Sequence, residues 1–156
     1  MAQNIVVNTT NAVAVITAEF YSDVAQRMEN DCVARLIERG VARNNIFTVR
    51  VPGCFELPFA AAEAASTQNF SAIVTLGLVV RGETSHYDYV AGECARGVAD
   101  VALKHRTPVI FGVLTTENWE QAEARMGGPK GNKARDAADC ALTMIGVCEM
   151  TSRWRP

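Results

Sequence analysis

The sequence predicts a single-domain α/β fold in which a four-stranded parallel sheet lies between two layers of helices. Short apolar runs alternate along the chain with segments whose apolar residues recur at helical spacing. One run, Ile73 to Val80 (IVTLGLVV), is uninterrupted, which is typical of a central parallel strand covered on both faces. The length of 156 residues suits one domain, residues 1–156, whose core needs no disulfide or metal.

By this pattern, the first half of the chain contains two strands and two helices. Strands are expected over Ala12 to Thr17 and over Ile46 to Val51. The first helix begins at Ser22, which we expect to cap it, and has an apolar residue at every fourth position. The second helix covers Glu56 to Ser66 and accepts Pro58 only in its first turn.

Two further strands are expected in the second half, over Ile73 to Val80 and over Pro108 to Leu114. Apolar residues at helical spacing place a long helix between about Ser85 and Lys104. After the fourth strand, Thr115 or Thr116 is expected to cap a shorter helix, which a glycine-rich bend then ends.

The last helix is expected to begin after Asn132, its capping residue, and to carry a continuous apolar face. That face consists of Ala134, Ala137, Ala138, Ala141, Leu142 and Ile145. Asn4 to Val7 is a candidate for a short extra strand within an extended N-terminal arm over residues 1–11, and residues 150–156 are expected to form a flexible tail. The alternation of strands and helices requires right-handed crossovers, so we predict a flavodoxin-like α/β/α sandwich.

Composition limits the classes of partner. Hydrophobic residues make up 49% of the chain, charged residues 21%, and the formal net charge is −2. Such a chain lacks the basic surface with which proteins bind nucleic acid or anionic membranes. Five cysteines without a C-x-x-C pair, together with two histidines, offer no recognisable zinc ligand set. We therefore expect a cytoplasmic protein with reduced thiols, no metal, no N-terminal signal and no membrane span.

Ligands of open parallel sheets bind beyond the carboxyl ends of the strands. This rule selects four loops before any motif is considered. They are Glu19 to Ser22, Pro52 to Glu56, Arg81 to His86, and Thr115 to Asn118.

The third of these loops contains the most informative residues. Gly82 permits a tight turn, and the hydroxyl groups of Thr84 and Ser85, with main-chain N–H groups at the start of a helix, suit an anion. His86 follows at the position where an imidazole can transfer protons beside that anion. The alternative for this loop is an ordinary helix cap with a surface histidine.

Other candidate residues also have an ordinary alternative. Glu56 can accept hydrogen bonds from ligand hydroxyls, or it can simply complement the dipole of its helix. Phe20 and Phe111 can contact a ligand or pack in the core. The chain has no G-x-S-x-G, Walker or G-x-G-x-x-G motif. The residues alone thus predict a protein that binds a small anionic, polyhydroxylated ligand and has one histidine for proton transfer.

Five stretches of the chain resemble the lumazine synthase family of riboflavin biosynthesis, in the family's order and spacing. They are Val51 to Pro58 (VPGCFELP), Gly77 to Val90 (GLVVRGETSHYDYV), Pro108 to Thr116 (PVIFGVLTT), Glu120 to Arg125 (EQAEAR), and Gly131-Asn132-Lys133. The combination of RG-x-T-x-H with EQA-x-x-R is highly specific.

The resemblance implies a transferase that uses no cofactor. Its reaction condenses 5-amino-6-(D-ribitylamino)uracil with 3,4-dihydroxy-2-butanone 4-phosphate, giving 6,7-dimethyl-8-ribityllumazine, phosphate and water. Family members form pentamers, and the short bend from Gly127 to Gly131 resembles that of members whose pentamers close into an icosahedral shell. Riboflavin synthase is then a further candidate partner.

The resemblance also implies roles for individual residues. The aminoribitylaminouracil is expected to contact Phe20, Cys54, Phe55, Glu56, Leu78, Val79, Val80 and Phe111. The butanone phosphate is expected to contact Glu83, Thr84 and Arg125. His86 corresponds to the catalytic proton-transfer residue, and Lys133 is a further candidate. Phe111 and Arg125 correspond to groups that reach the pocket from a neighbouring subunit.

Three positions depart from the family's usual pattern. Tyr21 stands where an asparagine is frequent, Cys54 where alanine or serine is usual, and Ala134 where glycine is common. None removes a group with an implied catalytic role.

Two other functions remain as alternatives. A flavin- or lumazine-binding module without catalysis would not need His86 and Arg125 together, and a shell-forming protein would function by assembly alone.

Overall fold

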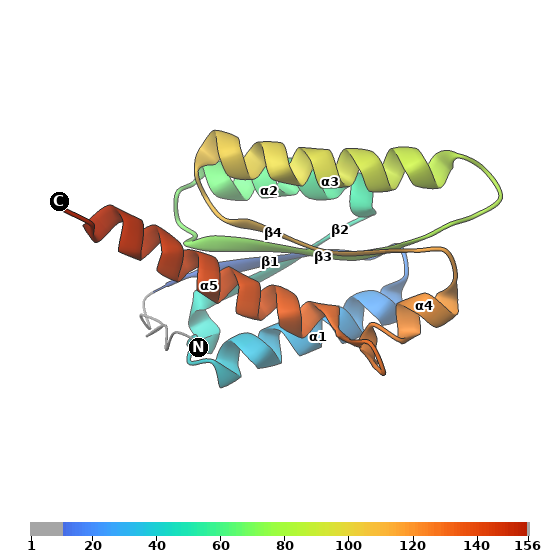
Figure 1. Cartoon of the computed structure of the whole chain (residues 1–156), viewed down its shortest axis with the longest axis horizontal. Coiled ribbons are helices and arrows are strands. Elements are labelled where there is room, and N and C mark those ends of the chain that lie inside the picture. The colour runs from blue at the N-terminus through green and yellow to red at the C-terminus, as the bar shows by residue number, and fades with distance from the viewer. Residues whose placement is uncertain (1–10, 156) are drawn as a thin grey trace.

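Four parallel strands form the central sheet of the computed structural model, which describes residues 11–155 (Figure 1). They are β1 (Val13–Ala18), β2 (Ile46–Val51), β3 (Ala72–Val80) and β4 (Val109–Thr116). Their order across the sheet is β2-β1-β3-β4, and all three neighbouring pairs are parallel. The predicted four-stranded parallel sheet is confirmed.

Helices cover both faces of the sheet and complete the predicted three-layer sandwich. They are α1 (Ser22–Glu38), α2 (Leu57–Ser66), α3 (His86–His105), α4 (Trp119–Glu123) and α5 (Lys133–Arg153). Figure 1 shows α2 and α3 on one face, with α1, α4 and α5 on the other. Short 3₁₀ turns lie before β2 (η1, Arg43–Asn45) and before α2 (η2, Cys54–Glu56), and β5 (Met126–Gly128) and β6 (Gly131–Asn132) form a small hairpin before α5.

The central strand lies in the core of the protein. Residues 72–78 of β3 are all buried, because β3 lies between β1 and β4 and has helices on both faces. One apolar cluster lies on the side of α1 and α5, and a second lies on the side of α2 and α3. The uninterrupted apolar run in the sequence corresponds to this burial on both faces.

Two of the predicted helix caps are wrong. The capping position of α1 belongs to Tyr21, whose extended backbone comes without a side-chain hydrogen bond, and Ser22 is already helical. The predicted Thr115 or Thr116 cap fails because β4 continues to Thr116, which pairs with β3. Asn118 caps α4 instead, and its side-chain oxygen accepts a hydrogen bond from the Gln121 N–H at 2.9 Å.

The last helix agrees with its predicted start and face. The side-chain oxygen of Asn132 accepts hydrogen bonds from the N–H groups of Ala134 and Arg135, at 3.1 and 3.2 Å. Every residue of the predicted apolar face is buried. The helix continues to Arg153, so residues 150–153 of the expected tail are helical. The candidate strand Asn4 to Val7, with the rest of the arm up to residue 10, lies outside the described residues.

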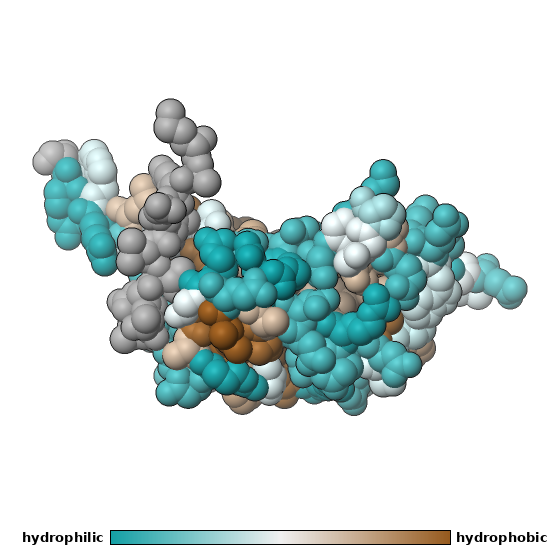
Figure 2. Space-filling model, turned by 90° about the horizontal axis from the view of Figure 1, so that it is seen from below, coloured by the Kyte–Doolittle hydropathy of each residue, from teal (hydrophilic) through white to brown (hydrophobic). Residues whose placement is uncertain are grey.

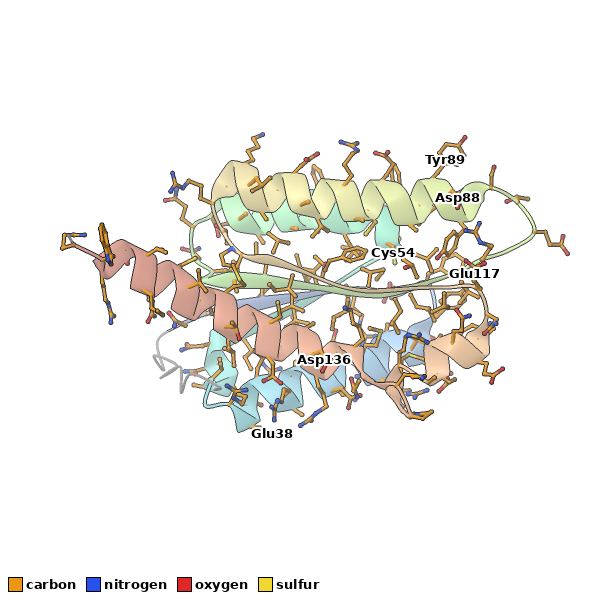
Figure 3. The ribbon with its side chains drawn as sticks, viewed as in Figure 1. Glu38, Cys54, Asp88, Tyr89, Glu117 and Asp136 are labelled. Carbon is orange, nitrogen blue, oxygen red and sulfur yellow. The ribbon has the colours of Figure 1, made fainter. Side chains whose placement is uncertain are left out.

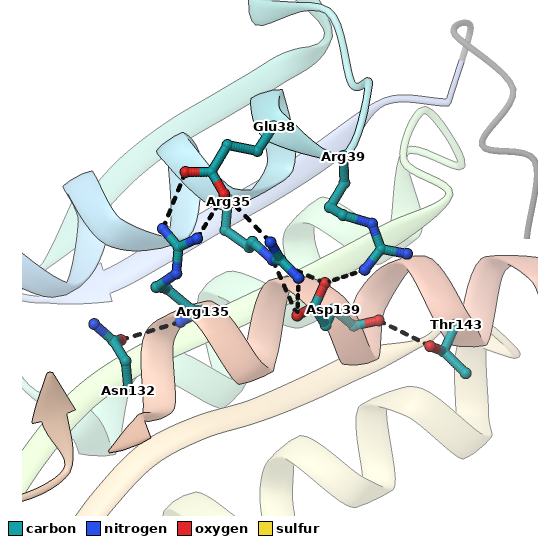
Figure 4. A network of polar contacts seen from close by, with 7 residues as sticks. All are labelled: Arg35, Glu38, Arg39, Asn132, Arg135, Asp139 and Thr143. Carbon is teal, nitrogen blue, oxygen red and sulfur yellow. Dashed lines mark hydrogen bonds and ion pairs between the residues drawn. The ribbon is translucent and has the colours of Figure 1, made fainter. Parts of the chain in front are cut away.

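A network of charged side chains joins α1 to α5 (Figure 4). The Arg35 Nε lies 3.0 Å from each carboxylate oxygen of Asp139, and Arg39 also donates to this carboxylate. Arg135 donates in turn to both carboxylate oxygens of Glu38, at 3.2 and 2.5 Å. These contacts link the two long helices on one face of the sheet.

The described surface is mainly hydrophilic on the face shown in Figure 2, with a compact hydrophobic area. Large exposed apolar side chains lie on the edge strand β2 (Phe47 and Val49) and on α5 (Met144, Val147 and Met150). Among the residues that the structure describes, none of the helices combines the length and the hydropathy needed to cross a membrane.

Candidate active site

The carboxyl ends of β1, β2 and β3 surround a pocket of about 560 Å³. Three of the four loops selected from the sequence contribute to its lining. The lining residues are Phe20, Tyr21, Gly53, Cys54, Phe55, Glu56, Leu78, Val79, Val80, Gly82, Thr84, His86, Tyr87, Tyr89 and Val90. The pocket therefore lies where the topology of an open parallel sheet predicts a ligand.

The end of β3 brings main-chain hydrogen-bonding groups to the pocket. The Arg81 N–H donates to the carbonyl oxygen of Thr116 at 2.9 Å, so the main-chain groups of residue 81 face β4. Because these groups alternate in direction along a strand, those of Leu78 and Val80 face β1. The pairing of β1 with β3 ends at Leu76. Beyond that point, the N–H and C=O groups of Leu78 and Val80 border the pocket and suit the polar edge of a planar heterocycle.

Cys54 lies buried beside the pocket, between the sheet and the helices of one face (Figure 3). Its thiol donates to the Leu78 carbonyl oxygen, with a sulfur–oxygen distance of 3.8 Å. Burial raises the pKa of the Cys54 thiol to about 12, so it is neutral at physiological pH and unsuited to nucleophilic attack. A side chain at Gly77 would place its Cβ 2.6 Å from the Cys54 sulfur, so the thiol requires a glycine there.

Aromatic side chains and one carboxylate surround the pocket mouth. Phe20 follows β1 and is 74% exposed, and Phe55 in η2 is 58% exposed. Glu56 occupies the capping position of α2, and one carboxylate oxygen lies 3.2 Å from the point where Gly53 would carry a Cβ. The ring faces suit a planar ligand, and the carboxylate can accept hydrogen bonds from hydroxyl groups.

Arg81 holds the loop between β3 and α3 in place. Its Nε lies 2.7 Å from a Glu117 oxygen and its Nη2 lies 3.0 Å from an Asp88 oxygen. Figure 3 shows Asp88 and Glu117 at the same end of the molecule. The guanidinium also lies 4.1 Å from the centre of the Tyr87 ring. Hydrogen bonds to Asp88 and Glu117 raise the pKa of Arg81, which remains charged. Arg81 therefore joins the ends of β3 and β4 to the start of α3.

His86 is the first residue of α3 and is exposed at the pocket. Its N–H donates to the Thr84 hydroxyl at 3.3 Å, and the Asp88 N–H donates to the Ser85 carbonyl at 3.0 Å. Thr84 and His86 line the same pocket, so a hydroxyl donor, the positive end of a helix and an imidazole lie together. Such a grouping can bind an anion and move a proton beside it.

Several predicted site residues do not line this pocket. Glu83 is exposed on the loop between β3 and α3, directly before Thr84. Phe111 lies half-buried on the edge strand β4, against the apolar cluster of α2 and α3. Arg125 follows α4 and donates to the Gln121 carbonyl at 3.0 Å, while the Lys133 N–H donates to the Arg125 carbonyl at 2.9 Å. Phe111, Arg125 and Lys133 therefore belong to β4 and the segments after it.

The pocket also contains residues that the sequence analysis did not single out as binding groups. Tyr89 and Val90 lie three and four positions after His86 on α3, so helical spacing from His86 would have identified them. Tyr21 directly follows Phe20, and Tyr87 lies beneath Arg81. Among residues 11–155, no group of three His, Cys, Asp or Glu side chains is placed to hold a metal ion.

The chain is similar in sequence to known proteins of one family. The family model for 6,7-dimethyl-8-ribityllumazine synthase matches residues 10–149. Two proteins named 6,7-dimethyl-8-ribityllumazine synthase, from Coxiella burnetii strains CbuG_Q212 and RSA 493 / Nine Mile phase I, are each 46% identical to this chain over 132 residues. Each match covers 85% of this chain and 87% of the relative. The protein of that name from strain Dugway 5J108-111 is similar to the same extent.

Proposed function

The chain belongs to the 6,7-dimethyl-8-ribityllumazine synthase family, and we propose that its pocket is where the two substrates of that reaction condense. The protein is a transferase of riboflavin biosynthesis, joining 5-amino-6-(D-ribitylamino)uracil to 3,4-dihydroxy-2-butanone 4-phosphate. The observation that carries the assignment of the site is the meeting of Phe20, Glu56, Thr84 and His86 in one pocket.

The uracil substrate binds with its ring against Phe20 and its polar edge along the end of β3. The main-chain groups of Leu78 and Val80 provide donors and acceptors for that edge, with Val79 between them. Glu56 accepts hydrogen bonds from ribityl hydroxyl groups, and Cys54 and Phe55 form the wall beside that chain. A polyol and a heterocycle thus meet groups of matching polarity.

The phosphate of the second substrate binds at the loop before α3. The Thr84 hydroxyl, the first turn of α3 and the adjacent Glu83 segment form one side of this site. Arg125 of a neighbouring subunit supplies the charge opposite, with Lys133 beside it, because an arginine fork suits phosphate oxygens. Phe111 of the same neighbour covers the uracil ring.

The reaction follows from this arrangement without a cofactor. The 5-amino group attacks the ketone carbonyl, and loss of water gives an imine. His86 takes the proton from the adjacent carbon while the carbon–oxygen bond to phosphate breaks, and the electron pair leaves with phosphate. The resulting enol takes up a proton and becomes a ketone, which the ribitylamino nitrogen attacks, and a second water is lost on ring closure. Close positioning of amine and ketone supplies much of the rate, and the acid–base group supplies more.

Mixing the protein with both substrates tests this function directly. Lumazine absorbance and free phosphate should rise together in equal amounts, and neither should rise when one substrate is omitted. A flavin- or lumazine-binding module without catalysis would bind the product yet release no phosphate. That outcome would reject the enzymatic function.

The assembly that completes the site is a ring of five subunits, and we propose that twelve such rings close into an icosahedral shell in the cytoplasm. The pocket lies over the ends of β1, β2 and β3, whereas Phe111 and Arg125 lie on the side of β4. Head-to-tail contact between these two sides closes a ring. The short bend with Gly127 and Gly131 supports the shell, within which riboflavin synthase is a candidate partner.

Refolding two inactive variants together tests the shared site. His86→Ala and Arg125→Ala chains should rebuild complete sites wherever an intact histidine of one chain meets an intact arginine of its neighbour. With equal random mixing each condition is met half the time, so activity should approach roughly a quarter of the wild-type value. If mixed assemblies, verified by mass spectrometry, are no more active than the separate variants, both residues serve the site of one chain.

A further inference from the structure

Three aromatic rings form a continuous series from the pocket to α4. The ring centres of Phe20 and Tyr21 lie 4.9 Å apart at an interplanar angle of 88°. The ring centres of Tyr21 and Trp119 also lie 4.9 Å apart, at 72°. Both pairs have the edge-to-face geometry that aromatic rings favour. Phe20 and Tyr21 both line the pocket, and Phe20 is the more exposed of the two.

The Phe20 ring is mostly exposed to solvent, and its aromatic contact is with Tyr21. It is 74% exposed in the turn between β1 and α1, whereas Tyr21 is half-buried against the apolar cluster beneath the sheet. Trp119 is the first residue of α4 and does not line the pocket, so its connection to Phe20 passes through Tyr21. The core thus holds Tyr21, and Tyr21 in turn contacts the exposed ring.

The position of Tyr21 directly before α1 indicates that its ring has a role other than starting the helix. It occupies the capping position with an extended backbone and without a side-chain hydrogen bond to the helix. Asparagine, aspartate or serine stabilises a helix at this position, and tyrosine does not. What Tyr21 provides instead is an aromatic ring that contacts Phe20 on one side and Trp119 of α4 on the other.

We propose that Tyr21 and Trp119 are positioning residues that hold the Phe20 ring against the planar ring of the uracil substrate. The start of α4 thereby influences the affinity for that substrate and not for the phosphate substrate, whose proposed contacts are with the loop before α3. This inference rests on the proposed function, because it takes Phe20 as the ring that contacts the heterocycle.

Steady-state kinetics of Tyr21→Asn and Trp119→Leu test the series of rings. Each should raise KM for 5-amino-6-(D-ribitylamino)uracil about 3- to 10-fold, the range expected for loss of an aromatic pair. The KM for 3,4-dihydroxy-2-butanone 4-phosphate and kcat at saturation should change by less than about twofold. Trp154→Leu, which removes the other tryptophan at a 70% exposed site beyond α5, is the matched control and should change none of these three constants.

Thermal stability distinguishes a loss of positioning of the Phe20 ring from general damage to the fold. Tyr21→Asn adds a capping side chain and removes a half-buried ring, two effects of opposite sign, so its Tm should change little while the affinity for the uracil substrate falls. Tyr21→Phe keeps the ring and should retain the wild-type KM, which provides a second test if the asparagine variant folds poorly.

Two results would overturn the proposal: an unchanged KM for the uracil substrate in Trp119→Leu, or an equal rise of both KM values in Trp119→Leu and Tyr21→Asn. Failure of the proposed function is a different result, because the unaltered protein would then form no lumazine.

Discussion

At the scale of single residues, two buried threonines differ in how their hydroxyl groups are satisfied. Thr17 on β1 and Thr75 on β3 are both fully buried. The Thr75 hydroxyl donates to the Ile110 carbonyl oxygen at 2.8 Å. The Thr17 hydroxyl has no hydrogen-bond partner among the residues that the structure describes. Since a buried polar group without a partner opposes folding, the two side chains contribute to stability with opposite sign.

Replacement of each threonine by valine keeps the shape and removes the hydroxyl. Thr17→Val should leave the free energy of unfolding unchanged or raise it by up to about 1 kcal/mol. Thr75→Val should lower it by about 1 kcal/mol through loss of its hydrogen bond. Thermal unfolding at one protein concentration compares the two variants. An equal loss of unfolding free energy in Thr17→Val and Thr75→Val would contradict the difference between the two hydroxyl groups.

The two histidines of the chain provide a matched pair at the ends of one helix. His86 begins α3 at the pocket, and His105 is the last residue at the opposite end of the same helix. His86→Ala should slow turnover toward the lower end of the range of about 10²–10⁴-fold for a positioned acid–base group, because proximity provides the remaining rate. His105→Ala should keep full activity. Turnover at saturating substrates decides this, and an unimpaired, correctly assembled His86→Ala would remove the histidine from the mechanism.

Residues at the strand ends were predictable from chain order alone. The end of an apolar run identifies the loop that follows it, so Phe20, Glu56 and His86 were expected near a ligand before any geometry was known. Tyr21 was not assigned to the pocket, because nothing local indicates that its ring lies between Phe20 and Trp119. That contact depends on α4, which lies about a hundred positions away along the chain.

At the scale of elements, the charged network between α1 and α5 makes their packing depend on pH. Hydrogen bonds from Arg135 and Arg35 lower the pKa of the Glu38 carboxyl in the folded protein. The folded pKa lies below the unfolded one, so the stabilisation is present above the unfolded pKa. It is lost as pH falls through the folded value.

Glu38→Gln should therefore lower the Tm slightly at neutral pH, and this difference from wild type should shrink as pH falls into the acid range where Glu38 is protonated. High salt should shrink it as well, because these side chains are partly exposed to solvent. Glu63→Gln, an exposed change on α2, is the control and should show neither trend. Scanning calorimetry across pH measures both variants, and a Tm difference that is constant with pH would refute the assignment.

Elements were predictable to the extent that their sequence pattern is local. The second strand has the predicted limits of Ile46 and Val51, because apolar runs and turn residues define it without reference to other segments. The cap of α4 was missed, since the length of β4 is set by its register with the end of β3. The hairpin of β5 and β6 was not foreseen either, because strands of three and two residues carry no periodic pattern.

At the scale of the whole molecule, the proposed shell predicts one large particle. Multi-angle light scattering should give a mass far above that of a pentamer of 16.9 kDa chains, and the mass should persist on dilution. The reason is the short bend before α5, which resembles that of shell-forming members. A single species at pentamer mass over a wide concentration range would reject the shell while leaving the shared site intact.

The part of the proposed site that could not be located from one chain is the part that we assign to the β4 side of a neighbouring subunit. Phe111, Arg125 and Lys133 were expected in the site through family resemblance, and none of them lines the pocket of the chain to which it belongs. Periodicity and chain order predict which residues lie inside a domain. They do not specify which outer surface a neighbouring copy presents.

The end of β3 has a consequence for how such a site changes over generations. At Leu78 and Val80 the pocket is bordered by peptide groups, which every amino acid except proline carries in full. A proline at Leu78 or Val80 would remove an N–H that faces the pocket and not one that bonds to β4, so proline is the one substitution there that alters this edge directly. Mutation can therefore alter rings, carboxylates and loop lengths around the ligand while the polar edge beneath it persists. A binding edge made of main-chain groups therefore persists for as long as the sheet itself is formed.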